Sequence, residues 1–112
     1  MPIPLLTRTV TILDGESDSD FISLKGNALV GIRPDAAFDG TGFTITTVYD
    51  VDDNATSVYN AETGSQVTLQ AAAGNYYAVD PTIFYGLTKI QLSSNAPQSG
   101  ADSVIILFLR AV

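Results

Sequence analysis

Residues 42–49 read Gly-Phe-Thr-Ile-Thr-Thr-Val-Tyr, and this stretch decides the fold class. Phe43 and Ile45 alternate with Thr44 and Thr46, so an extended strand here has one apolar side and one polar side. Threonine, valine and aromatic residues are also more frequent in strands than in helices. The stretch therefore predicts a β-strand with one face in a core and the other in water.

The same two-residue alternation recurs along the chain, between short segments rich in Gly, Asp, Asn, Ser and Pro. We expect strands at residues 7–13, 21–24, 28–32, 42–49, 57–59, 66–70, 76–79, 89–93 and 103–110. Asp80 followed by Pro81, with Gly86 behind them, predicts one helical or 3₁₀ turn between two strands. About eight short strands joined by such turns are typical of an all-β, single antiparallel β-sandwich, either jelly-roll or Ig-like.

The first residues differ from the rest of the chain. Prolines at positions 2 and 4 favour an extended arm over a regular strand ladder. We therefore expect an extended N-terminal arm over residues 1–6 and one sandwich domain over residues 7–112. Ile3, Leu5 and Leu6 are too apolar for a plain solvent-exposed tail, so the arm is expected to pack on its own domain or to reach a neighbour.

The segment from Val104 to Leu109 is apolar at every position, so both faces of this strand should be covered. Two accounts stay open. The second face lies either under a long loop of the same domain or against a neighbouring subunit. In the second account Ile105, Leu107 and Leu109 join the apolar residues of the arm as an assembly interface.

Composition narrows the classes of function. The chain has no cysteine and no histidine, so it lacks thiol chemistry, the usual neutral-pH base and the commonest zinc ligand. Twelve acidic residues against five basic ones give a net charge of −7, and the bases form no cluster in the sequence. Neither nucleic acid nor an anionic membrane is therefore an expected partner. No apolar run approaches the roughly 20 residues of a membrane span, and the N-terminus does not resemble a signal peptide, so synthesis in a cytoplasm is expected.

Two acidic segments invite comparison with cation sites. Residues 14–20 and 50–54 are rich in aspartate, but neither completes the calcium-loop pattern of glycine and closing glutamate. Solvated turns are the favoured interpretation, and no metal or cofactor is expected. The acids lie in predicted turns where nothing perturbs their pKa values, and the serines and threonines lack an activating base. The chain is therefore not expected to be an enzyme.

The five tyrosines suggest a competing function. A flat row of them could stack on sugar rings, as in carbohydrate-binding sandwiches. There is no tryptophan, and most of the tyrosines fall at inward-facing or edge positions of the predicted strands. Packing in a core or an interface is therefore favoured for these residues: Tyr49, Tyr59, Tyr76, Tyr77 and Tyr85.

Three motifs in fixed order give the chain a resemblance to a known group. Leu29–Pro34 reads Leu-Val-Gly-Ile-Arg-Pro, Phe38–Thr44 reads Phe-Asp-Gly-Thr-Gly-Phe-Thr, and Val79–Gly86 reads Val-Asp-Pro-Thr-Ile-Phe-Tyr-Gly. From Thr7 to Arg110 this order is similar to small proteins encoded among the head and structural genes of tailed bacteriophages and prophages. The chain departs from that pattern between residues 49 and 63.

The resemblance implies a structural part of the virion. The implied role is a capsid decoration (cement) protein that binds the outer capsid surface and stabilises it, with the major capsid protein as partner. Such proteins resemble jelly-roll or Ig-like sandwiches and commonly form trimers, so a homotrimer on the capsid surface is expected. The alternative is a receptor- or carbohydrate-binding module of a head or tail fibre.

Overall fold

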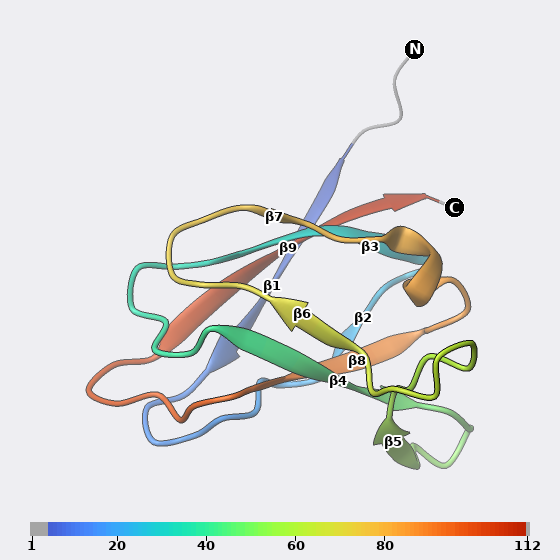
Figure 1. Cartoon of the computed structure of the whole chain (residues 1–112), viewed down its shortest axis with the longest axis horizontal. Coiled ribbons are helices and arrows are strands. Elements are labelled where there is room, and N and C mark those ends of the chain that lie inside the picture. The colour runs from blue at the N-terminus through green and yellow to red at the C-terminus, as the bar shows by residue number, and fades with distance from the viewer. Residues whose placement is uncertain (1–4, 112) are drawn as a thin grey trace.

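The computed structural model describes residues 5–111 and has two antiparallel sheets packed face to face (Figure 1). The expected all-β sandwich is confirmed, with nine short strands. They are β1 (Leu6–Ile12), β2 (Ile22–Ser23), β3 (Asn27–Pro34), β4 (Gly42–Val48), β5 (Ala55–Ser57), β6 (Thr68–Gln70), β7 (Tyr77–Ala78), β8 (Lys89–Ser94) and β9 (Ser103–Ala111). One 3₁₀ turn, η1 (Pro81–Phe84), precedes β8.

The strand order places the last strand in the middle of a sheet. The first sheet has the order β1-β9-β3-β7, and the second has the order β2-β8-β4-β5, with β6 also paired to β4. We call them sheet A and sheet B. Along β1 and β9 the register runs from Leu6 opposite Leu109 to Ile12 opposite Ser103. The two ends of the described chain therefore lie side by side in sheet A (Figure 1).

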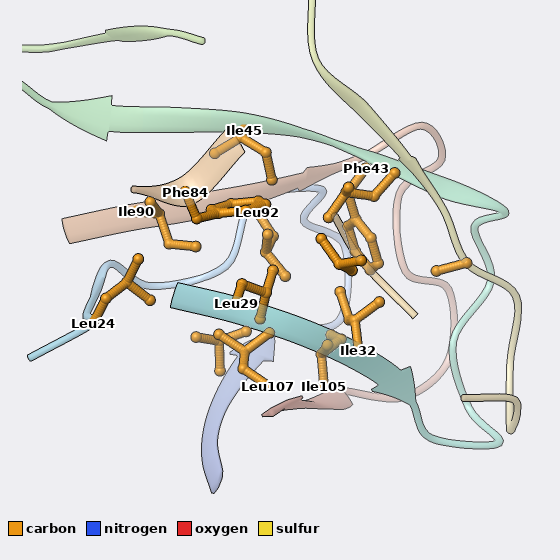
Figure 2. Close-up of a cluster of buried hydrophobic side chains, with 14 of the residues drawn as sticks. Leu24, Leu29, Ile32, Phe43, Ile45, Phe84, Ile90, Leu92, Ile105 and Leu107 are labelled. Atoms are coloured by element: carbon orange, nitrogen blue, oxygen red, sulfur yellow. The ribbon is translucent and has the colours of Figure 1, made fainter. Parts of the chain in front are cut away.

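The core lies between the sheets and is built from every second residue of their strands. In sheet B, Phe43 and Ile45 point inward, while the alternating Thr44 and Thr46 are only half-buried. Phe38, from the preceding loop, stacks on Phe43 with ring centroids 4.8 Å apart. Burial of each large apolar side chain contributes roughly 1.5–3 kcal/mol. Figure 2 shows the centre of this cluster, which includes Leu24, Leu29, Ile32, Phe84, Ile90, Leu92, Ile105 and Leu107.

The predicted turn after residue 80 forms as expected. The Asp80 carboxylate accepts a hydrogen bond from the Thr82 amide at 3.1 Å, and Pro81 occupies the first position of η1. Gly86 ends the segment with a φ of 84°, a conformation that glycine adopts without steric cost. The turn directs Phe84, which is fully buried, into the end of the core.

The first strand begins and ends one residue earlier than the strand expected at residues 7–13. Leu6 belongs to β1 and pairs with Leu109, so the ladder begins one residue earlier than the prolines suggested. Ile3 lies outside the described residues. In the part of the chain from residue 5 to residue 111, no helix has the length and apolarity needed to cross a bilayer.

Candidate assembly interface

Strand β9 decides which apolar residues are available to a partner. Ile105, Leu107 and Leu109 are 0%, 0% and 1% exposed, and they point into the core between the sheets. The expectation that these three side chains face a neighbouring subunit is therefore wrong. Because side chains alternate along a strand, the residues between them must point to the opposite side of sheet A.

The outer row of β9 consists of Val104, Ile106 and Phe108. Val104 is 39% exposed, and the other two are half-buried. No loop of the described chain covers this row completely. The expectation that a loop of the same domain covers the second face of β9 is therefore met only in part. Tyr76, which precedes β7, adds an aromatic ring that is 51% exposed and packs edge-on against Phe108, with centroids 4.9 Å apart and the planes at 60°.

Gly31 holds this aromatic pair close to the sheet. It lies opposite Phe108 in the pairing of β3 with β9. A Cβ atom at this position would overlap the hydroxyl and the ring of Tyr76. Glycine is therefore required for Tyr76 to lie this close to β3. We call Val104, Ile106, Phe108 and Tyr76 the apolar row.

Charge is unevenly divided between strands and loops. None of the twelve acidic residues lies in a strand, whereas sheet A contains Arg8, Arg33 and Arg110. Within residues 5–111 the one ion pair shorter than 4.0 Å joins Lys89 to Asp53, so these arginines have no carboxylate that close. Arg33 donates from Nε to the Gly74 carbonyl at 3.2 Å. Sequence reasoning missed this grouping because the three arginines are far apart along the chain.

The outer face of sheet B offers a contrast within the same molecule. Its strands β4 and β8 present half-buried threonine, glutamine and serine side chains instead of an apolar row: Thr44, Thr46, Gln91 and Ser93. In water, the outer faces of a β-sandwich are commonly polar. The apolar row of sheet A therefore distinguishes one face of the molecule from the other.

The remaining predicted interface residues lie at the beginning of the described chain. Leu5 and Leu6 are 42% and 48% exposed, so neither is buried in the domain. Leu6 and Leu109 face one another across the ladder, but only Leu109 reaches the core. The exposure of Leu5 and Leu6 leaves them accessible to a neighbour.

The first acidic segment builds turns. The Asp14 carboxylate accepts from the Gly100 amide at 2.8 Å, and its own amide donates to Asp102 at 2.8 Å. The Asp20 carboxylate accepts from the Thr11 amide at 3.0 Å. Among residues 5–111 no group of three or more potential metal ligands comes together.

The second acidic segment is closed by Asp50. Its carboxylate accepts from the amides of Asp52 and Asn54, both at 3.0 Å, and from the Asn54 side chain at 2.8 Å. The side-chain hydrogen bond from Asn54, followed by the backbone one, lowers the pKa of Asp50 from its ordinary 3.8, because both stabilise the carboxylate.

A buried glutamine that sequence reasoning missed ties the loops together. Gln98 is 2% exposed; it accepts from the Asp39 amide at 2.8 Å and donates to the carbonyls of Ala37 and Ala101 at 2.9 and 3.1 Å. Its partners lie up to 61 residues away. No local pattern marks such a residue, because its role depends on loops that meet only in the folded chain.

The tyrosines are more exposed than expected. Only Tyr77 is half-buried against the core, whereas the exposed fractions of the other four are 51–63%. Packing in the core, one half of the expectation, is therefore wrong for these four, and packing in an interface stays a prediction. Tyr59 borders a shallow hollow that is also lined by Asn60, Glu62, Asp80 and Thr82.

Comparison with known proteins supports the fold. No protein-family model and no curated protein sequence matches the chain. Among solved structures, the SPBc2 prophage-derived protein YomS matches with a TM-score of 0.56 at 11% identity, covering 97% of both chains. The Yersinia pseudotuberculosis-derived mitogen matches at 0.43 and 14% identity, covering 99% of this chain and 88% of its own. The IMPa metallopeptidase in complex with T-antigen matches at 0.46 and 15% identity, covering 98% of this chain but 13% of its own. The first match shows that the two-sheet fold also occurs in a prophage-derived protein, and the other two are too distant to support an argument.

Proposed function

We propose that this chain is a virion structural protein of a tailed bacteriophage, and specifically a non-catalytic capsid decoration protein. The observation that carries the proposal is the apolar row on the outer face of sheet A, beside Arg33 and Arg110, which have no carboxylate partner within 4.0 Å among the described residues. An exposed apolar strip lowers the solubility of a free domain. It contributes binding energy when a folded surface covers it.

Two further observations support a phage setting. The order of the three motifs from residue 29 to residue 86 resembles that of phage head proteins. The fold is shared with YomS, a prophage-derived protein. Because one fold hosts many functions, the match adds to the proposal only together with the apolar row.

The proposed mechanism is attachment without chemistry. The apolar row and the exposed Leu5 and Leu6 bind the outer surface of the major capsid protein, and the bound state of both partners is stabilised by mass action. Assembly as a homotrimer joins three footprints, so each can be weak while the whole binds firmly. The acidic loops form the rest of the surface and keep closely spaced copies soluble.

The number of copies per particle tests this function. Quantitative mass spectrometry of purified particles should find this chain in a simple ratio to the major capsid protein, near one copy per capsid subunit. A handful of copies per particle would indicate a fibre or a vertex instead. Complete absence of the chain from particles would refute a virion role.

One observation favours the second candidate, a receptor- or carbohydrate-binding module on a fibre. Tyr59 is 59% exposed beside the hollow that contains Asn60, Glu62 and Thr82, so an aromatic face and polar groups lie together. Low copy number combined with loss of glycan binding in Tyr59→Ala would support this candidate. Tyr59→Phe is the matched control, because it keeps the aromatic face.

A further inference from the structure

Strand β1 is the one long free edge of the described sandwich. The other strands at sheet edges, β2, β5, β6 and β7, are two or three residues long, whereas β1 has seven residues. Short edge strands limit unwanted pairing with other chains. β1 pairs on one side with β9 over its whole length, and no strand of residues 5–111 pairs with its other side.

One hydrogen bond shows which backbone groups of β1 point to the open edge of sheet A, away from β9. The Thr11 amide donates to the Asp20 carboxylate, on the side away from β9, and the neighbouring Ile12 forms an isolated bridge with Ser19 on that side. Backbone groups of successive strand residues point to opposite sides. The amides and carbonyls of Thr7 and Thr9 therefore also point away from β9, while those of Arg8 and Val10 face it.

The open part of this edge has a single protecting feature, the charge of Arg8. From residue 6 to residue 10 the strand has no proline, no acidic residue and no bulge, and Thr7 and Thr9 are exposed. Threonine is a good strand former, so the edge is preorganised for another strand. The outward groups of Thr7 and Thr9 offer two donors and two acceptors to an extended chain.

We propose that β1 receives an extended segment of the capsid partner, which extends sheet A by one strand and places a carboxylate beside Arg8. This inference rests on the proposed function. Arg8 is half-buried and has no carboxylate within 4.0 Å among the described residues, so a strand with an aspartate or glutamate at the facing position completes the pair.

A second copy of this chain fits the same edge poorly. Suppose that two copies pair antiparallel through β1 and use the free amides and carbonyls of Thr7 and Thr9. Thr7 of each copy then lies opposite Thr9 of the other copy. That register places Arg8 directly opposite Arg8 of the other copy. Like charges opposite one another in a strand pair are destabilising, so charge favours an acidic partner over self-pairing.

A proline at position 9 provides the test. Thr9→Pro removes an amide that faces outward and places the ring at the open edge, where proline is tolerated by the fold. The matched control, Thr9→Val, keeps the backbone donor. Binding of each variant to purified capsids of a phage lacking this chain is measured by co-sedimentation, with thermal unfolding as the check on folding. We expect Thr9→Pro to bind at least about ten-fold more weakly, and Thr9→Val to bind like wild type.

Hydrogen exchange on the wild-type protein provides a readout that needs no variant. Resolved to single amides, exchange at Thr7 and Thr9 should be fast in the free protein and slow on capsids, whereas Arg8 and Val10 should be protected in both. Unchanged exchange at Thr7 and Thr9 on capsids, or equal binding of folded Thr9→Pro, would overturn the strand addition and leave the proposed function intact. Failure of wild type to bind capsids would overturn the proposed function and the strand addition with it. A dimer in solution that Thr9→Pro dissociates would show that a second copy occupies the edge, against the proposal.

Discussion

Replacing Leu107 by alanine tests which face of β9 belongs to the core. Leu107 is 0% exposed, lies between β1 and β3 in the middle of sheet A, and faces sheet B. Strands on both sides limit collapse around the lost methyl groups. Truncation of a buried leucine costs 2–5 kcal/mol, and we expect about 3 kcal/mol here. For a domain of this size that corresponds to a fall in melting temperature of roughly 12 °C.

The adjacent residue supplies the matched comparison. Ile106 lies on the outer face and is only half-buried, so Ile106→Ala should lower the free energy of unfolding by about 1 kcal/mol or less. If the apolar row binds the capsid, this variant should instead lose affinity for particles. Urea unfolding followed by far-ultraviolet circular dichroism measures both stabilities. A larger loss for Ile106→Ala than for Leu107→Ala would refute the assignment of the two faces.

Three other substitutions test particular contacts. Gly31→Ala should destabilise the fold by roughly 1–3 kcal/mol by displacing the Tyr76 ring, and a double-mutant cycle should show that Tyr76→Ala removes most of this penalty. Gln98→Ala should lower the free energy of unfolding by about 3 kcal/mol, because buried loop groups lose their partners; a loss below about 1 kcal/mol in urea titration would contradict this role. In an NMR titration the Asp50 carboxyl should have a pKa below 3.8, and Asn54→Ala should raise it toward that value. Since the folded-state pKa is lowered, the stabilisation from Asp50 is present above its unfolded pKa and is lost as the pH falls through the folded one.

The fold was predictable where one face of a strand is apolar and the other is polar. Phe43 and Ile45 in β4, and Ile90 and Leu92 in β8, alternate with polar residues, so their inward direction follows from the sequence alone. The turn at Asp80 was predictable because capping and proline geometry are local.

The candidate site was less predictable, for a physical reason. In β9 both sets of alternating residues are apolar, so the sequence contains no signal that distinguishes Leu107 from Ile106. Only pairing with β1 and β3 fixes which set faces sheet B. The same holds for Arg33 and Arg110, which the register of β3 and β9 brings into one sheet although they are separated by most of the chain.

The place of β9 between β1 and β3 also constrains how the protein is made. Synthesis proceeds from the N-terminus, so β1 and β3 leave the ribosome long before the strand that joins them. The ladders of β1 and β3 with β9 cannot form until β9 has emerged, whereas β4, β5 and β6 can pair earlier. During that interval the inner apolar residues of β1 and β3 lack their partner. The negative charge of the acidic turns opposes association of nascent chains during this interval.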